Sequence, residues 1–127
     1  MSMLEGFTVF NPKEGVPYVS VTSNGVTFNR SVVMKMQYAD HVLLLFNEDT
    51  RKMAIQRCDR DTPNATPFYK MKKNEVLSVR WNNKDLINTI TKIMGWDLTK
   101  TGFKVKGDLI REEDAMIFDL DKAVPLS

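Results

Sequence analysis

The sequence predicts an α+β domain in which two hairpin-rich halves, each with one short helix, pack as one antiparallel sheet or barrel-like domain. Three observations predict it: short apolar runs that alternate with polar residues, turn residues between those runs, and two helical stretches that each follow an asparagine. The chain has 127 residues, an ordinary length for one domain. We therefore expect a single domain over 1–127, with halves at 18–58 and 68–126 joined by a linker at 59–67.

The first half begins with a hairpin. Residues 18–23 and 25–28 alternate apolar and small polar side chains, which predicts two short strands. Asn24-Gly25 stands between the two runs, and both residue types tolerate the positive φ of a type I′ turn. The pattern predicts a turn centred on this pair.

A helix and a second hairpin complete the first half. Asn29 suits an N-cap, and the apolar face of the short helix after it comprises Val32, Val33 and Met36. The apolar run at 41–46 predicts a buried strand. After a polar turn at 47–50, residues 51–57 alternate through Met53 and Ile55 and predict its hairpin partner.

The linker and the next two strands open the second half. Residues 59–67 are dense in Asp, Pro, Asn and Thr, which predicts an irregular connection. Residues 68–72 and 76–81 predict strands. An extended segment ending in Asn82 or Asn83 then offers an N-cap to the longest helical pattern in the chain.

That pattern predicts a helix over 84–94. Its apolar stripe falls at i, i+1, i+4, i+7 and i+8 and comprises Leu86, Ile87, Ile90, Ile93 and Met94. Gly95 follows at the position where helices end in the left-handed conformation. Strands are predicted at 102–110 and 115–120 on either side of a charged turn, and 123–126 extend the last strand.

The two halves share a local signature. Val26-x-Phe28-Asn29 recurs 53 residues later as Val79-x-Trp81-Asn82, and each copy precedes a predicted helix. A duplicated unit explains the echo, and so does chance similarity between two strand–helix junctions. The sequence leaves both explanations open.

Part of the first half resembles a known family. The segment 25–30 leading to Val33, then Ala39-Asp40-His41-Val42, then the apolar pair of runs at 43–45 and 53–55, is similar to the AbrB and SpoVT-like swapped-hairpin proteins. The resemblance implies a dimer formed by hairpin exchange and a basic DNA-binding face. If the echo is a duplication, the resemblance also implies equivalent places for Arg30 and Lys84 at the two helix starts, with Arg51, Lys52 and Arg57 along the first hairpin.

Composition bounds the class of protein. The apolar share of 43% and the charged share of 27% are typical of globular chains, and no run is long enough to cross a bilayer. The single cysteine, Cys58, excludes an internal disulfide, and the first ten residues do not resemble a signal peptide. We expect a cytoplasmic protein with no membrane partner.

The distribution of charge suggests a partner. The formal net charge is +2, but residues 30–92 carry twelve Lys or Arg and seven acids. The predicted nucleic-acid-binding residues are eight of the cations in this region: Arg30, Arg51, Lys52, Arg57, Lys70, Lys72, Lys73 and Arg80. Lys70 and Lys72 alternate on one strand face, which suits phosphate contact and equally suits a solvated edge strand.

Catalysis has little support in the sequence. His41 is the only histidine, and the neighbours of Cys58 are acidic rather than activating. Glu112-Glu113-Asp114 is typical of a solvated turn, while Trp81 and Trp96 suit core anchors better than base-stacking platforms. We expect no catalytic residue, metal or cofactor.

The sequence therefore favours a non-catalytic nucleic-acid-binding module, of the kind found in transcription regulators, with DNA as its partner. The alternative is a protein–protein interaction or assembly module, including a homodimer. An enzyme is the third option, with a site built from the acidic turn and His41.

Overall fold

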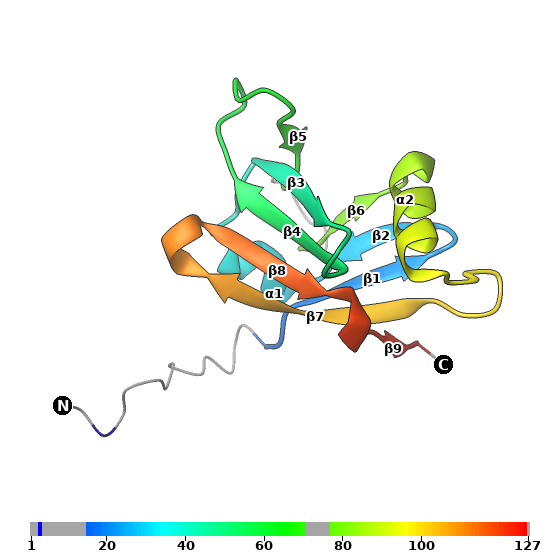
Figure 1. Cartoon of the computed structure of the whole chain (residues 1–127). Helices are drawn as coiled ribbons and strands as arrows, with labels where there is room; N and C mark the ends of the chain where they lie inside the picture. Colours follow the sequence, from blue (N-terminus) through cyan, green and yellow to red (C-terminus); the bar gives the residue numbers. More distant parts are fainter. Residues whose placement is uncertain (1–2, 4–14, 71–76, 127) are drawn as a thin grey trace.

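The computed structural model describes residue 3, residues 15–70 and residues 77–126 (Figure 1). Within these ranges, the chain forms one curled antiparallel sheet and two α-helices, which confirms the predicted α+β class. The elements in chain order are β1 Tyr18–Thr22, β2 Gly25–Phe28, α1 Arg30–Lys35, β3 His41–Asn47, β4 Lys52–Arg57, β5 Thr66–Pro67, β6 Val79–Trp81, α2 Lys84–Met94, β7 Phe103–Ile110, the 3₁₀ turn η1 Arg111–Glu113, β8 Ala115–Asp119, the 3₁₀ turn η2 Leu120–Lys122 and β9 Val124–Pro125.

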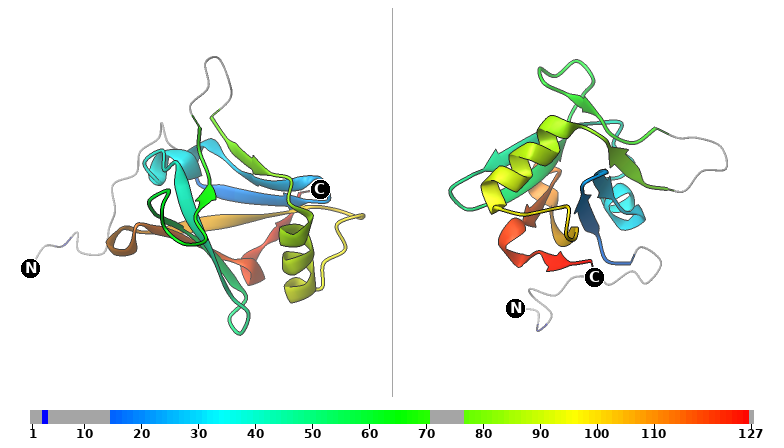
Figure 2. Two further views of the ribbon diagram at one scale, coloured as in Figure 1. Left: turned by 90° about the horizontal axis from the view of Figure 1, so that it is seen from above. Right: turned by 90° about the vertical axis from the view of Figure 1, so that its right-hand side faces the viewer.

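The sheet curls into a half-barrel. Its strand order is β5-β3-β4-β8-β7-β1-β2-β6, and β9 pairs separately with β7. The two outer strands of this order approach each other, because the indole Nε1 of Trp81 on β6 donates to the carbonyl of Pro67 on β5 at 3.2 Å. In the right-hand view of Figure 2 the strands surround a common centre.

That centre holds the hydrophobic core. The inward-facing valines of β1 and β2 are completely buried, and four aromatic rings meet beside them: Phe28, Phe68, Trp81 and Phe118. The ring of Phe28 lies 5.0 Å from that of Trp81 in an edge-to-face arrangement, a favourable geometry for aromatic pairs. Trp96 stacks on Phe103 at 4.2 Å. Both tryptophans therefore pack against the core, as predicted.

The two helices lie toward opposite ends of the sheet (Figures 1 and 2). The Asn29 side chain caps α1 by accepting from the Val32 amide at 3.2 Å, and it also accepts from the Tyr18 amide of β1. Asn83, rather than Asn82, caps α2. Gly95 ends α2 with φ 68°, in the left-handed conformation that the sequence predicts. No helix in the described ranges has the length and apolarity needed to span a membrane.

The prediction for the first turn is wrong by one residue. Thr22 pairs with Gly25, so the two loop residues are Ser23 and Asn24. Gly25 belongs to β2, where an added Cβ would lie 2.9 Å from the carbonyl oxygen of Trp81 on β6. Glycine is therefore required by the close approach of a neighbouring strand rather than by the turn.

The prediction that 41–46 is fully buried is also wrong. Along β3, Val42 is buried whereas Leu45 is 44% exposed. The sheet turns only one face toward the core, so an apolar run does not require cover on both faces.

Two strand boundaries differ from the prediction for a related reason, namely that pairing partners set them. β5 lies inside the predicted linker because Thr66 pairs with Val42 of β3. The chain continues beside β3 as the Phe68 amide donates to the Asp40 carbonyl at 2.8 Å, but residues 71–76 lie outside the described ranges. At the C-terminal end, η2 interrupts the last strand, and β9 pairs with β7 instead of extending β8.

Candidate nucleic-acid interface

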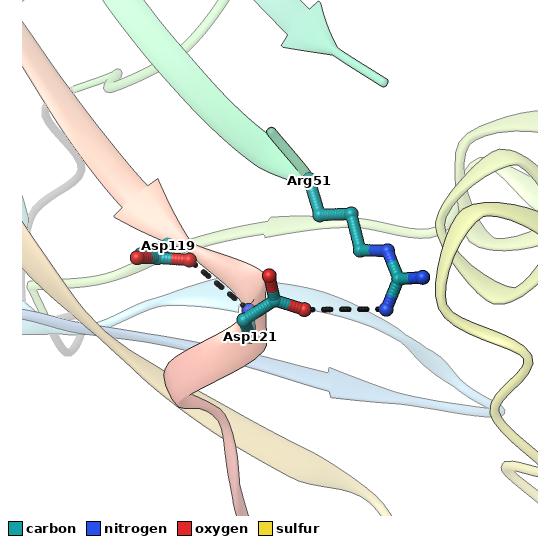
Figure 3. A network of polar contacts seen from close by, with 3 residues as sticks. All are labelled: Arg51, Asp119 and Asp121. Carbon is teal, nitrogen blue, oxygen red and sulfur yellow. Dashed lines mark hydrogen bonds and ion pairs between the residues drawn. The ribbon is translucent and has the colours of Figure 1, made fainter. Parts of the chain in front are cut away.

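Three of the predicted cations lie at the two ends of β4. Arg51 is the turn residue before the strand, Lys52 begins it and Arg57 ends it, so about 17 Å of extended backbone separates Lys52 from Arg57. The Arg51 guanidinium donates to the Asp121 carboxylate at 3.4 Å, and the Asp121 amide donates to Asp119 (Figure 3). The structure therefore does not bring these three cations together.

The other predicted cations are distributed over different elements. Arg30 begins α1, Lys70 follows β5, and Arg80 lies on the outward face of β6, where its guanidinium donates to the Asn24 carbonyl at 3.2 Å. Lys72 and Lys73 lie outside the described residues.

A different pair of cations lies on the outer face of β7, beside Tyr18 of β1. Tyr18 on β1 pairs with Lys106, and Ser20 pairs with Lys104. The Lys104 ammonium lies 4.9 Å from the centre of the Tyr18 ring, which places it within range of a cation–π interaction. Side chains alternate across a strand, so these four residues share the face opposite the buried Val19 and Val105.

The strand registers continue this face across the sheet. Ser20 pairs with Thr27, and Thr27 pairs with Arg80. The resulting row, Lys104–Ser20–Thr27–Arg80, crosses three strand spacings, about 14 Å between its end backbones. We call this row, together with Tyr18 and Lys106, the β1–β7 face.

The charge of the β1–β7 face is positive. It holds three cations, and the next outward position along β7, Asp108, contributes a carboxylate at its border. Arg80 is the one member that the sequence analysis selected. Lys104-Val105-Lys106 repeats the alternation noticed at Lys70 and Lys72, so the same signal could have found it.

The residues considered for catalysis do not form a cluster in the described ranges. Glu112, Glu113 and Asp114 are exposed in and beside η1. The His41 imidazole Nδ1 lies 3.5 Å from the Asp40 carboxylate. Among the described residues, no three His, Cys, Asp or Glu side chains gather as metal ligands would.

One exposed carboxylate has a perturbed acidity. The Thr99 hydroxyl and the Thr99 amide both donate to the Asp97 carboxylate in the turn after α2. These two hydrogen bonds, the hydroxyl first, lower the pKa of Asp97 below its ordinary value. This turn borders a cleft of about 290 Å³ beside α2, lined in part by Ile87, Thr91 and Leu98.

Comparisons of the chain with protein-family models, curated proteins and solved structures found no match.

Proposed function

We propose that this protein is a non-catalytic nucleic-acid-binding module that contacts a single strand with the β1–β7 face. One observation carries the proposal: cations stand at both ends of a cross-strand row, and a tyrosine and polar hydroxyls lie between or beside them. Proteins that bind single strands combine cations that follow the backbone with aromatic rings on which bases stack. Lys104, Lys106 and Arg80 supply the first component, and Tyr18 supplies the second.

Salt-dependent binding tests this proposal. We expect a labelled single-stranded oligonucleotide to bind the full chain at low salt, with affinity that falls as salt rises. Replacing Lys104 and Lys106 with Ala should weaken binding and reduce the slope of log K against log salt by about 0.7 for each phosphate that is no longer neutralised. Fluorescence anisotropy measures both quantities. A duplex probe in the same experiment tests the role expected of a transcription regulator.

A matched variant separates the face from bulk charge. Lys84→Ala with Lys92→Ala removes two positive charges from α2, outside the face, and should leave binding nearly unchanged. Tyr18→Ala should cost about 1–3 kcal/mol if one base stacks on the ring, whereas Tyr18→Phe should retain most of that energy. Equal weakening by the two double-lysine variants, or no binding at low salt, would remove the proposal.

A second candidate, self-assembly, rests on a different surface. The registers place Leu45, Ala54 and Ile117 in one cross-strand row on the outer face of β3, β4 and β8, and Leu45 is 44% exposed. Such an apolar row suits contact with another copy of the chain. Sedimentation would then show a mass that rises with concentration, and Ile117→Lys should abolish the rise. A constant monomer mass would exclude this candidate.

We also infer that the two halves are copies of one β-α-β-β unit. Two hydrogen bonds, one at each end of the β4–β8 pairing, are consistent with this. The Arg57 amide donates to the Asp114 carbonyl at 2.8 Å, and, 63 residues later along the chain, the Leu120 amide donates to the Arg51 carbonyl at 3.0 Å. The β2–β6 register centres on Thr27 and Arg80, which keeps the 53-residue offset of the sequence echo.

If the halves are copies, one chain forms what swapped-hairpin proteins form from two, which is consistent with the family resemblance. The Arg57 and Leu120 amides should then be protected from hydrogen exchange to similar degrees, because each donates the hydrogen bond at one end of the β4–β8 pairing. Rapid exchange at one of these two amides alone would argue against two equivalent halves.

A further inference from the structure

A small cavity opens where three segments meet: the end of α1, the end of β4 and the turn between β7 and β8. Its volume is about 90 Å³. Met36 and Leu109 contribute apolar lining. Three cations from three separate segments also line it, namely Lys35, Arg57 and Arg111. The sequence alone does not reveal this group, because Arg57 lies 22 residues after Lys35 and 54 residues before Arg111.

The position of Arg57 is well defined by its neighbours. Its amide donates to the Asp114 carbonyl at 2.8 Å, and its guanidinium donates to the Gln37 side-chain oxygen at 3.1 Å. The adjacent Gln56 side chain donates to the Glu113 carbonyl at 2.9 Å. Arg57 is therefore oriented by a neutral amide, which uses one of its five N–H donors and leaves its charge uncompensated by that contact.

The backbone around the cavity is strained. Gln37 and Asp114 both line it, and both take positive φ, 57° and 49°. Tyr38, next to Gln37, also has φ 57°. Residues in this conformation persist where surrounding contacts impose it, and they are enriched at binding sites. Here the two strained turns place Gln37 against Arg57 and bring Arg111 to the same opening.

The guanidinium groups indicate the ligand. Among the described residues, Arg57 and Arg111 line the cavity together with Lys35 and the carboxylate of Asp114. A phosphate monoester carries a charge of about −1.5 to −2 near neutral pH and offers three acceptor oxygens. Arginine guanidinium groups bind such groups through paired N–H donors.

We propose that this cavity binds a phosphate-monoester dianion, with Arg57 and Arg111 as its donors and Lys35 as a further positive charge. Free phosphate and the terminal phosphate of a nucleotide chain share this chemistry. The site is separate from the β1–β7 face, so it does not depend on the proposed single-strand contact.

Titration of the full chain with sodium phosphate at constant ionic strength and neutral pH tests the proposal. We expect saturable changes in the amide NMR signals of residues 35–37, 57 and 111–114, with sulfate competing and chloride not competing. Arg57→Gln and Arg111→Gln should each weaken binding about tenfold or more, since each removes a charged hydrogen-bond donor. Arg57→Lys should weaken it less than Arg57→Gln while losing the paired donors.

Arg60→Gln is the matched control, since Arg60 is an exposed arginine outside this cavity and the variant makes the same change of charge. It should leave phosphate binding unchanged. Non-saturating shifts, or equal weakening by Arg60→Gln and Arg57→Gln, would overturn the proposal. Unchanged amide spectra of Arg57→Gln in the absence of phosphate establish that this variant is folded.

Two further probes identify the source of the phosphate. A short oligonucleotide with a 5′-phosphate should compete with inorganic phosphate more strongly than the same oligonucleotide with a 5′-hydroxyl if a chain terminus is bound. Equal competition together with inorganic phosphate binding supports free phosphate as the ligand. Lys104→Ala with Lys106→Ala should retain phosphate binding, so failure of the β1–β7 face and failure of this site give different results.

Discussion

The β3–β4 and β7–β8 hairpins end in turns with similar backbones and different side chains. Each turn finishes with a residue of positive φ, Arg51 at 55° and Asp114 at 49°. The carbonyl of each accepts a backbone hydrogen bond from the other hairpin, from the Leu120 amide in one case and from the Arg57 amide in the other. Leu120 is 1% exposed, whereas Arg57 is exposed.

The two donors, buried Leu120 and exposed Arg57, give the two turns different surroundings. At the first turn, Leu120 belongs to the core, and an exposed ion pair between Arg51 and Asp121 lies above it. At the second turn, a cation stands at the corresponding hydrogen bond and a cavity remains beside it. The same backbone hydrogen bond therefore adjoins the core where an aliphatic side chain donates it, and adjoins the proposed phosphate site where an arginine donates it.

The largest expected effect tests the first turn, where Leu120 is buried. Leu120→Ala should destabilise the protein by about 2–5 kcal/mol, because it removes buried methyl groups and leaves a cavity in the core. Arg57→Ala should cost less than about 1 kcal/mol, because an exposed side chain loses one hydrogen bond. Urea unfolding with a constant m value measures both. Similar costs for the two substitutions would contradict the contrast between the two turns.

A smaller effect is expected inside the β7–β8 hairpin. Gly107 faces the core, and an added Cβ would lie 2.5 Å from the Met116 sulfur and 2.8 Å from the Phe118 ring. Gly107→Ala should therefore destabilise by about 1–3 kcal/mol through overpacking. The same unfolding measurement checks this prediction. Gly95 provides a comparison, because there an added Cβ meets no atom within 4 Å and any cost of Gly95→Ala comes from the backbone φ of 68°. Increased stability of Gly107→Ala would show that Met116 moves aside freely.

The ion pair at the first turn should contribute less than either of these. Arg51 and Asp121 are each 53% exposed, so solvent screens their attraction. Asp121→Asn should cost at most about 1 kcal/mol, and the difference should vanish at about 1 M salt. Unfolding at two salt concentrations measures this. A cost that persists at high salt would mean that the carboxylate acts through packing rather than charge.

The smallest effect concerns Asp97, which lies in the turn after α2 and outside both hairpins. The lowered pKa of Asp97 means that its contribution to stability is present above the unfolded pKa and is lost as the pH falls through the folded pKa. Thr99→Val removes the hydroxyl donor, so the Asp97 pKa should rise toward its ordinary value. Side-chain NMR titration measures the shift, and an unchanged pKa would show that the Thr99 amide alone sets it.

Local sequence signals predicted the helices well. Asn83, the apolar stripe and Gly95 fix α2 within one stretch of chain, and Asn29 does the same for the start of α1. These signals act over a few residues and need no distant partner. The α+β class could also be predicted, because runs that alternate apolar and polar residues indicate antiparallel strands even when their pairing partners are unknown.

Long-range pairing could not be predicted. The pairing of β4 with β8 and that of β9 with β7 depend on how the whole sheet curls. The cavity is a product of the same pairing, since Arg57 and Arg111 meet only when the second hairpin docks on the first. The Lys104 and Lys106 alternation was readable in the sequence, but its position beside Tyr18 was not.

The bond from Trp81 to Pro67 has a consequence for polymerisation. It joins the two ends of the strand order, where β5 has two residues, one of them a proline without an amide hydrogen, and β6 has three. A strand from another molecule needs a row of unpaired backbone groups on which to anneal, and these two ends offer little of one. Fibril growth through β5 or β6 would first have to break that indole contact.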